Sequence, residues 1–419
     1  MSRRRRALIV GGSMSGLFAA LMLQRRGWDV DVFERVDTEL ASRGAGILAQ
    51  AELIAHLGAL GFDVRRLGVT LNTRKMLDAA GGVMHAIERP HLMAAWEHIY
   101  RVLREALPAP CYHRGRSVTA FRQDADGVVA KFSDGSVAAG DVLIGADGLR
   151  STVRQQCLPS VAPLYAGYVA WRAVLPEDVL PPAIHRDLFA TMTFCLPPGE
   201  QFVAYPITGP NGDLRTGHRR YNVVWYRPAD EAKELPALLT DDSGVTHAIS
   251  IPPPLIPRAA IAAMRAAAER LLAPQFRAVV RLIEEPMLQP IYDLESPQLA
   301  FGRVAIIGDA AFVARPHVAA GVSKAADDAA ALAAALDADD VEAALLRFEA
   351  ERLPVGHKII ERARYLGAYL QATQTAEDRS RSARHGIPEA VLAETATIDF
   401  HHARPREERT GRANRAHSD

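Results

Sequence analysis

The stretch Ala7-Leu-Ile-Val-Gly-Gly-Ser-Met-Ser-Gly16 decides the fold of this chain. Residues 7–10 form a short apolar run, which predicts a buried parallel strand, and a glycine-rich turn follows it directly. From Ser15 onward the apolar residues keep helical spacing, and residues 29–33 then alternate as a second strand that ends at Glu34. Strand, glycine turn, helix, strand and acid make up a dinucleotide-binding βαβ unit.

The residue types of this turn suit a pyrophosphate. Small side chains let backbone N–H groups approach the phosphates at a helix N-terminus, where the helix dipole favours negative charge. Glu34, roughly 20 residues after the turn, would accept hydrogen bonds from an adenosine ribose. A plain α/β turn followed by a surface glutamate would give the same pattern, and Ser13 stands where glycine is usual. The unit alone does not separate NAD from FAD.

Composition points to a small-molecule partner. The 419 residues are 49% hydrophobic, and 49 basic residues balance 49 acidic ones, so no net field would gather nucleic acid or an anionic membrane. Three cysteines, not spaced as metal ligands or a redox pair, indicate a reducing cytoplasm and no metal site. Residues 3–23 resemble a secretory signal, but glycines break the apolar run, and a strand followed by a helix accounts for it.

Two later motifs also place a glycine at the end of a predicted strand. Short strands with Asp-Gly turns between residues 117 and 140 lead into Asp141-Val-Leu-Ile-Gly-Ala-Asp-Gly148. The run Arg303-Val-Ala-Ile-Ile-Gly-Asp-Ala-Ala311 ends a strand at Gly308-Asp309, and a helix is expected from Gly321 through Ala335. Asp309 could bind a polyol chain, and the start of that helix offers N–H groups to a flavin edge. A common Asp-Gly turn would also explain Asp147.

With these three motifs in order, the chain resembles the single-component flavoprotein aromatic hydroxylases, the group of p-hydroxybenzoate and salicylate hydroxylases. The segments Tyr165–Arg172, Val203–Ile207 and Gly308–His317 are most similar to those of members that hydroxylate hydroxypyridines. The resemblance implies bound FAD, NADH or NADPH as co-substrate, and dioxygen added to reduced flavin as a C4a-hydroperoxide in a water-poor site. The expected FAD contacts are Gly11, Gly12, Ser13, Met14, Ser15, Gly16, Glu34, Arg35, Gly46, Val118, Asp147, Gly148, Asp309, Ala320, Gly321 and Val322.

Three residues are candidates for the chemistry on a small phenol or hydroxypyridine. His317 would deprotonate or orient a ring hydroxyl. The sequence is equally consistent with a histidine that only forms hydrogen bonds to the loop backbone. Pro316 would shape the flavin side of the site through its rigid backbone. Tyr205 lies in an alternating strand and would line the substrate site, or would be an ordinary half-buried tyrosine of a sheet.

The predicted fold is α/β, with a Rossmann-like FAD-binding domain, an inserted antiparallel-sheet substrate domain and C-terminal helices. Strands are expected at Val169–Val174, Leu188–Leu196, Phe202–Ile207 and Arg220–Tyr226, and helix at Ala259–Glu285 and at Val341–Thr373, with a new helix starting at Pro354. The exposed sides of the terminal helices would fit either packing in a homodimer or contact with solvent. The predicted division is residues 1–70, 100–165 and 288–335 for FAD, 71–99 and 166–287 for substrate, 336–395 for helices and 396–419 for a polar tail.

Two other functions use the same fold. An oxidase, dehydrogenase or reductase would act on a non-aromatic substrate, and reduction of the flavin by the substrate itself would exclude the monooxygenase. A silent flavin-binding protein would hold FAD, and no small ligand would stimulate turnover.

Overall fold

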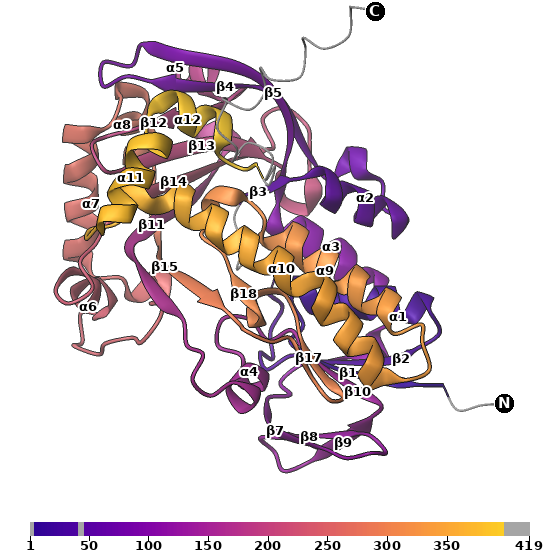
Figure 1. Ribbon diagram of the computed structural model, residues 1–419. Helices are drawn as coiled ribbons and strands as arrows, with labels where there is room; N and C mark the ends of the chain where they lie inside the picture. Colours follow the sequence, from indigo (N-terminus) through magenta and orange to yellow (C-terminus); the bar gives the residue numbers. More distant parts are fainter. Residues whose placement is uncertain (1–3, 41–45, 398–419) are drawn as a thin grey trace, which may run out of the picture.

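The computed structural model describes residues 4–40 and 46–397 and is organised by two sheets (Figure 1). The smaller sheet is parallel apart from its edge strand β16, and β1 lies inside it between β10 and β2. In spatial order its strands are β16 (Ala300–Phe301), β17 (Val304–Ile306), β10 (Val142–Gly145), β1 (Arg6–Val10), β2 (Asp29–Phe33) and β6 (Tyr112–His113). The two strands predicted around the first glycine turn are confirmed.

Helices pack with this sheet in one large apolar core. They are α1 (Met14–Arg25), α2 (Ala51–Ala59), α3 (Trp96–Ala106), α9 (Gly321–Ala335) and the long α10 (Val341–Gly367). The helix predicted from Gly321 to Ala335 is confirmed. A separate three-stranded meander lies below this sheet in Figure 1, as the Asp-Gly turns predict: β7 (Val118–Gln123), β8 (Val128–Phe132) and β9 (Val137–Gly140).

The larger sheet is antiparallel except where β12 runs parallel to β4. In spatial order its strands are β18 (Phe312–Val313), β15 (Met287–Glu295), β11 (Leu164–Pro176), β14 (Arg220–Pro228), β13 (Gln201–Ile207), β12 (Met192–Cys195), β4 (Gly68–Leu77), β5 (Val83–Ala95) and β3 (Gly46–Ala49). Strands β3, β15 and β18 come from segments expected to serve the FAD domain, so the chain crosses between the two sheets more often than the predicted ranges suggest.

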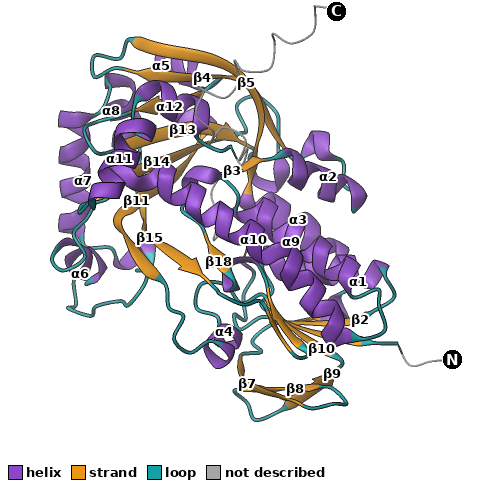
Figure 2. Ribbon diagram, viewed as in Figure 1, coloured by secondary structure: helices purple, strands orange, loops and turns teal. Residues whose placement is uncertain are grey.

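The two faces of this sheet have different neighbours (Figure 2). Because side chains alternate along a strand, Val169, Trp171 and Ala173 of β11 turn to one face, where they pack on helices. Those helices are α5 (Pro182–Leu188), α6 (Glu234–Leu239), α7 (Arg258–Leu271) and α8 (Pro274–Arg281). Tyr168 and Ala170 turn to the other face and share a second core with α12 (Pro388–Glu394), which follows α11 (Ala376–His385).

Three predicted elements differ from the structure. The strand expected at Leu188–Leu196 begins only at Met192, because α5 continues through Leu188. The helical stretch Ala259–Glu285 is two helices, since Pro274 occupies the first turn of α8, where its fixed φ and missing N–H are tolerated. Pro354 does not start a helix but lies inside α10.

The continuity of α10 has a packing reason. Leu345 and Phe348 before the proline and Ile359 and Ile360 after it are all buried. Burial of this stripe outweighs the roughly 3 kcal/mol that an interior proline costs. Among the residues that the structure describes, no helix is both long and apolar enough to cross a membrane. Part of the glycine loop Arg43–Ile47, and the tail from residue 398, lie outside the described residues.

Candidate functional site: a crevice between the two sheets

The three predicted motifs meet at the carboxyl ends of the parallel strands. Gly11 has φ +105°, and a side chain there would put its Cβ 2.6 Å from the carbonyl carbon of Ala146 and 2.8 Å from Cα of Asp147. Gly308 has φ +59°, and its Cβ would lie 2.8 Å from Cβ of Ser15. Segments separated by more than a hundred residues therefore touch through glycines, which are required by both space and conformation.

The start of α1 is free to bind an anion. Its N-cap residue Ser13 makes no side-chain capping bond, and no acidic residue lies in the first turn. The first N–H groups of a helix have no partner within the helix, so those near Met14, Ser15 and Gly16 suit phosphate oxygens. The Met14 side chain itself is buried in the core, which leaves only its backbone for a ligand.

Glu34 closes the far end of this crevice. Its carboxylate accepts hydrogen bonds from the backbone N–H of Gly12 at 2.9 Å and of Val36 at 3.0 Å. A cavity of about 70 Å³ beside it is lined by Val10, Gly11, Phe33, Glu34, Arg35, Arg116, Ser117, Val118, Asp147, Arg150 and Thr152. Five of the predicted contacts are thus brought together at one end: Gly11, Glu34, Arg35, Val118 and Asp147.

Asp147 also stabilises the start of a helix. Its carboxylate accepts from the backbone N–H of Thr152 at 2.7 Å and of Val153 at 3.2 Å, at the start of α4 (Thr152–Cys157). The next residue, Gly148, has φ +75°, a conformation that favours glycine. The Asp-Gly pair therefore shapes the loop that borders the crevice, whatever else it contacts.

A second cavity, of about 250 Å³, lies where the crevice reaches the large sheet. From the predicted set it is lined by Gly46, Tyr205, Asp309, Pro316, His317, Ala320, Gly321 and Val322. The start of α9 has no side-chain cap there, so its N–H groups face the cavity unpaired by the helix. Ala319 adopts the left-handed conformation, φ +50°, and this turns the chain from His317 into α9. Local strain of this kind is common at functional sites.

His317 is buried, and its Nε2 lies 2.9 Å from the hydroxyl of Tyr168. Its ring also packs on Tyr226, with centroids 4.5 Å apart. Burial, and after it the charge of Arg315, lowers the pKa of His317 to about 3, so the imidazole is neutral near pH 7. A neutral ring with so low a pKa is a weak base, and the geometry favours the orienting role.

Arg315 fixes the loop that carries Pro316 and His317. Its guanidinium pairs with Asp293 at 2.8 Å, and both side chains are buried. It also donates to Gln371 at 2.7 Å. Pro316 opens the short turn that follows, which spans Pro316–Val318. The buried ion pair and the bond to Gln371 tie this loop to β15 and to the chain after α10.

Tyr205 touches the other end of the cavity. Its hydroxyl donates to the carbonyl of Gly46 at 3.2 Å, while Asn222 accepts from the N–H of Gly46 at 2.9 Å. A side chain at Gly46 would collide with both, its Cβ lying 3.0 Å from Cγ of Asn222. Tyr205 therefore lines the cavity and positions strand β3.

Sequence reasoning missed Arg172 as a site residue. It lines the 250 Å³ cavity and donates to Gln289 at 2.7 Å, and its buried Nε has no partner among the described residues. Its charge also reaches Tyr205 and Tyr226, since it acts to lower the pKa of both, although burial raises each. The alternation in Tyr168–Arg172 was a signal that could have found it, because every second residue there shares the face that carries Tyr168.

Family comparisons agree with this arrangement. A model described as "FAD binding domain-like" matches residues 165–293, and one described as "FAD binding domain" matches residues 294–363. The chain belongs to the family of FAD-dependent aromatic monooxygenases, and FAD is its cofactor. It is 32% identical over 385 residues to 2,6-dihydroxypyridine 3-monooxygenase of Paenarthrobacter nicotinovorans, covering 91% of this chain and 96% of that protein.

Solved structures show the same fold. The structure of 2,6-dihydroxypyridine-3-hydroxylase from Arthrobacter nicotinovorans matches with a TM-score of 0.83 and 32% identity, over 89% of this chain and 94% of that one. A second relative, 3-amino-4-hydroxybenzoate 2-monooxygenase of Streptomyces cremeus, is 29% identical over 86% of each chain. The predicted fold class, enzyme class and flavin cofactor are confirmed.

Proposed function

We propose that this enzyme hydroxylates a small aromatic ring that carries an ionisable hydroxyl group, a hydroxypyridine or a phenol, with NADH or NADPH and dioxygen. The observation that carries the proposal is Arg172, which brings a positive charge into the cavity beside the loop of residues 315–321. A guanidinium attracts the deprotonated form of a ring hydroxyl. That form is the more electron-rich one and reacts more readily with an electrophilic oxygen.

The names of the two relatives support a hydroxylated ring. One is a dihydroxypyridine monooxygenase and the other an aminohydroxybenzoate monooxygenase. The size of the cavity supports a small substrate, because about 250 Å³ has to serve both the flavin edge and the ring.

FAD fits the residues present. We assign its pyrophosphate to the turn Gly11–Gly16 and its adenosine end to Glu34, Arg35 and Val118, with Asp147 and Gly148 bordering them. We assign its ribityl chain to Asp309, and its ring to Gly46 and to Ala320, Gly321 and Val322. A bound FAD would supply the redox chemistry, which is acceptance of hydride from NAD(P)H and transfer of one atom of dioxygen to the substrate ring, with the other atom leaving as water.

The side chains around the ring position it and exclude water. Arg172 would hold the anionic ring oxygen in place, with Gln289 fixing the guanidinium. His317, held neutral and fixed by Tyr168, would orient a ring hydroxyl by a hydrogen bond. The aromatic faces of Tyr205 and Tyr226 supply apolar surface that keeps water from the reacting atoms.

The division of labour within the chain follows the two sheets. We propose that residues 1–70, 100–165 and 288–335 mainly serve FAD, and that 71–99 and 166–287 mainly serve the substrate. A reducing cytoplasm is the compartment we propose, because the three cysteines are free thiols.

The test is a panel of dihydroxypyridines, hydroxybenzoates and other hydroxylated heterocycles. Purified enzyme should oxidise NADH or NADPH faster in the presence of a substrate, and product mass should show one added oxygen. Anaerobic reduction of the flavin by a substrate alone, without nicotinamide, would instead identify an oxidase or dehydrogenase and overturn the proposal.

A further inference from the structure

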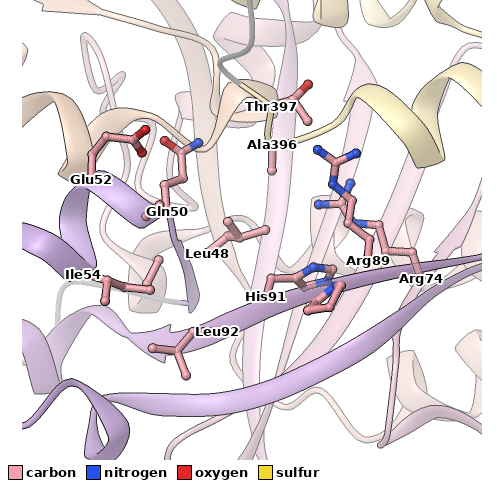
Figure 3. Close-up of a pocket in the computed structure, with 13 residues that line it drawn as sticks. Leu48, Gln50, Glu52, Ile54, Arg74, Arg89, His91, Leu92, Ala396 and Thr397 are labelled. Atoms are coloured by element: carbon pink, nitrogen blue, oxygen red, sulfur yellow. The ribbon is translucent and has the colours of Figure 1, made fainter.

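A larger cavity, of about 670 Å³, adjoins the cavity of about 250 Å³ that we assign to the flavin ring. Figure 3 shows the larger cavity. It is bordered by the start of α2, by β5 and by the chain after α12, and its lining includes Gln50, Glu52, Arg74, Arg89, His91 and Ala396. Leu48 and Ala396 line both cavities. Gln50 donates to the carbonyl of Val318 at 2.9 Å, in the turn that carries His317. A ligand here would therefore lie next to the flavin site.

Several buried polar atoms in this lining have no hydrogen-bond partner among residues 4–40 and 46–397. They include the ring nitrogens of His91, which is only 9% exposed, although the ring also interacts with the backbone of Pro90. Nε of Arg74, which is 1% exposed, and the side-chain oxygen of Gln50 belong to the same set. Unpaired buried polar atoms reduce stability, so most are satisfied in native proteins. These three side chains give the cavity a partly polar lining.

The lining is positively charged on one side. Figure 3 shows the guanidinium groups of Arg74 and Arg89 on the opposite side of the cavity from Glu52. One nitrogen of Arg74 donates to the carbonyls of Leu392 and Thr395, and one of Arg89 donates to that of Ala393, which fixes both side chains against α12. Their remaining donors are available to an anion.

His91 completes this side as a neutral donor. Burial, followed by the charges of Arg74 and Arg89, lowers its pKa to about 4. A neutral imidazole can still donate one hydrogen bond to a phosphate oxygen, and it does so without adding a third charge.

We propose that this cavity binds the phosphate-bearing part of the nicotinamide dinucleotide that reduces the flavin. The inference rests on the proposed function, which requires such a co-substrate. The turn Gly11–Gly16 is assigned to the pyrophosphate of FAD. The phosphates of NAD(P)H therefore need another anion-binding site close to the flavin ring. This cavity has the charge, the size and the position, and it borders the flavin site through Leu48 and Ala396.

The experiment compares two substitutions with a matched control in the full-length, FAD-loaded enzyme. Arg89→Gln removes a cation from a half-buried residue, and His91→Leu removes two ring nitrogens from a buried one. Arg270→Gln is the control, because Arg270 likewise donates to a backbone carbonyl, but it is exposed and lies on α7. Calorimetry measures the Kd of ADP-ribose, which carries the pyrophosphate but no hydride, and rapid mixing measures flavin reduction against NADH and NADPH concentration.

We expect Arg89→Gln and His91→Leu to raise the Kd of ADP-ribose and the half-saturating NAD(P)H concentration about tenfold, a change of about 1.4 kcal/mol. The limiting rate of flavin reduction and the Kd of the aromatic substrate should not change. His91→Leu should also leave the melting temperature equal or higher, since its ring makes no hydrogen bond to another described side chain.

Unchanged nucleotide binding in both variants, or an equal loss in Arg270→Gln, would overturn the inference. Weaker binding of the aromatic substrate alone would also overturn it and would make the cavity a substrate entrance. If neither nicotinamide reduces the flavin of the wild-type enzyme, the proposed function fails, whereas binding of ADP-ribose still tests the cavity.

Discussion

Replacing Arg172 by methionine tests the substrate assignment most sharply. Methionine keeps an unbranched apolar chain of similar reach and removes the charge, so the fold loses only the bond to Gln289. A hydrogen bond to a charged group contributes about 1.5–3 kcal/mol, or roughly 10- to 160-fold in Kd. Because Arg172 is half-buried and partly solvated, we expect the lower end of this range, about a tenfold rise in Kd.

The assay is the change in flavin absorbance on substrate binding, followed as a function of pH. Wild-type Kd should fall as the pH rises through the pKa of the substrate hydroxyl, because the guanidinium prefers the anion. In Arg172→Met this preference should disappear. Arg172→Lys should retain the pH dependence with weaker binding, since it keeps the charge and loses the planar fork.

Arg122→Met is the matched control, at an exposed arginine of the small meander. If Arg172→Met binds substrate as tightly as wild type, or if Arg122→Met weakens binding equally, Arg172 does not recognise the substrate and the proposed role is wrong.

Three further predictions concern the cofactor site and the buried histidine. Gly11→Ala should yield protein with little bound FAD, measured by its visible absorbance, because the new Cβ would lie 2.6 Å from the carbonyl carbon of Ala146. Tyr168→Phe leaves Nε2 of His317 unpaired and should lower the free energy of unfolding, measured with urea, by about 1–3 kcal/mol. An unchanged free energy of unfolding would show that this hydrogen bond is not formed. The pKa of His317 is lowered in the folded state from 6.5 to about 3, so the unfolded chain takes up the proton first and stability falls as pH drops below about 6.5. His317→Gln should flatten this slope, by up to about 1.4 kcal/mol per pH unit.

The cofactor half of the site could be predicted because its signals are local. A strand, a glycine turn and a helix lie within one short segment around Gly11. Around Asp309 a strand end and a glycine turn again lie together, and α9 follows from Gly321. Each segment specifies its own strand end and turn, and parallel strands bring such ends to one edge of a sheet. The order of the motifs then predicted the convergence.

The substrate half could not be predicted in the same way. Arg172 meets Gln289 because β11 pairs with β15, with Ala170 opposite Gln289, and no local pattern specifies that register. Tyr168 reaches His317 for the same reason, from a strand far away in sequence. In α10 a local signal was present but misleading. Pro354 favours a helix start, yet burial of the side chains on both sides of it keeps α10 continuous.

The proposed reaction places one atom of dioxygen on a small hydroxylated ring. The direct measurement is mass spectrometry of the product formed from NAD(P)H and a dihydroxypyridine under heavy-isotope dioxygen in ordinary water. We expect one labelled oxygen in each product molecule. A product whose new oxygen is unlabelled, and therefore comes from water, would contradict the proposed reaction.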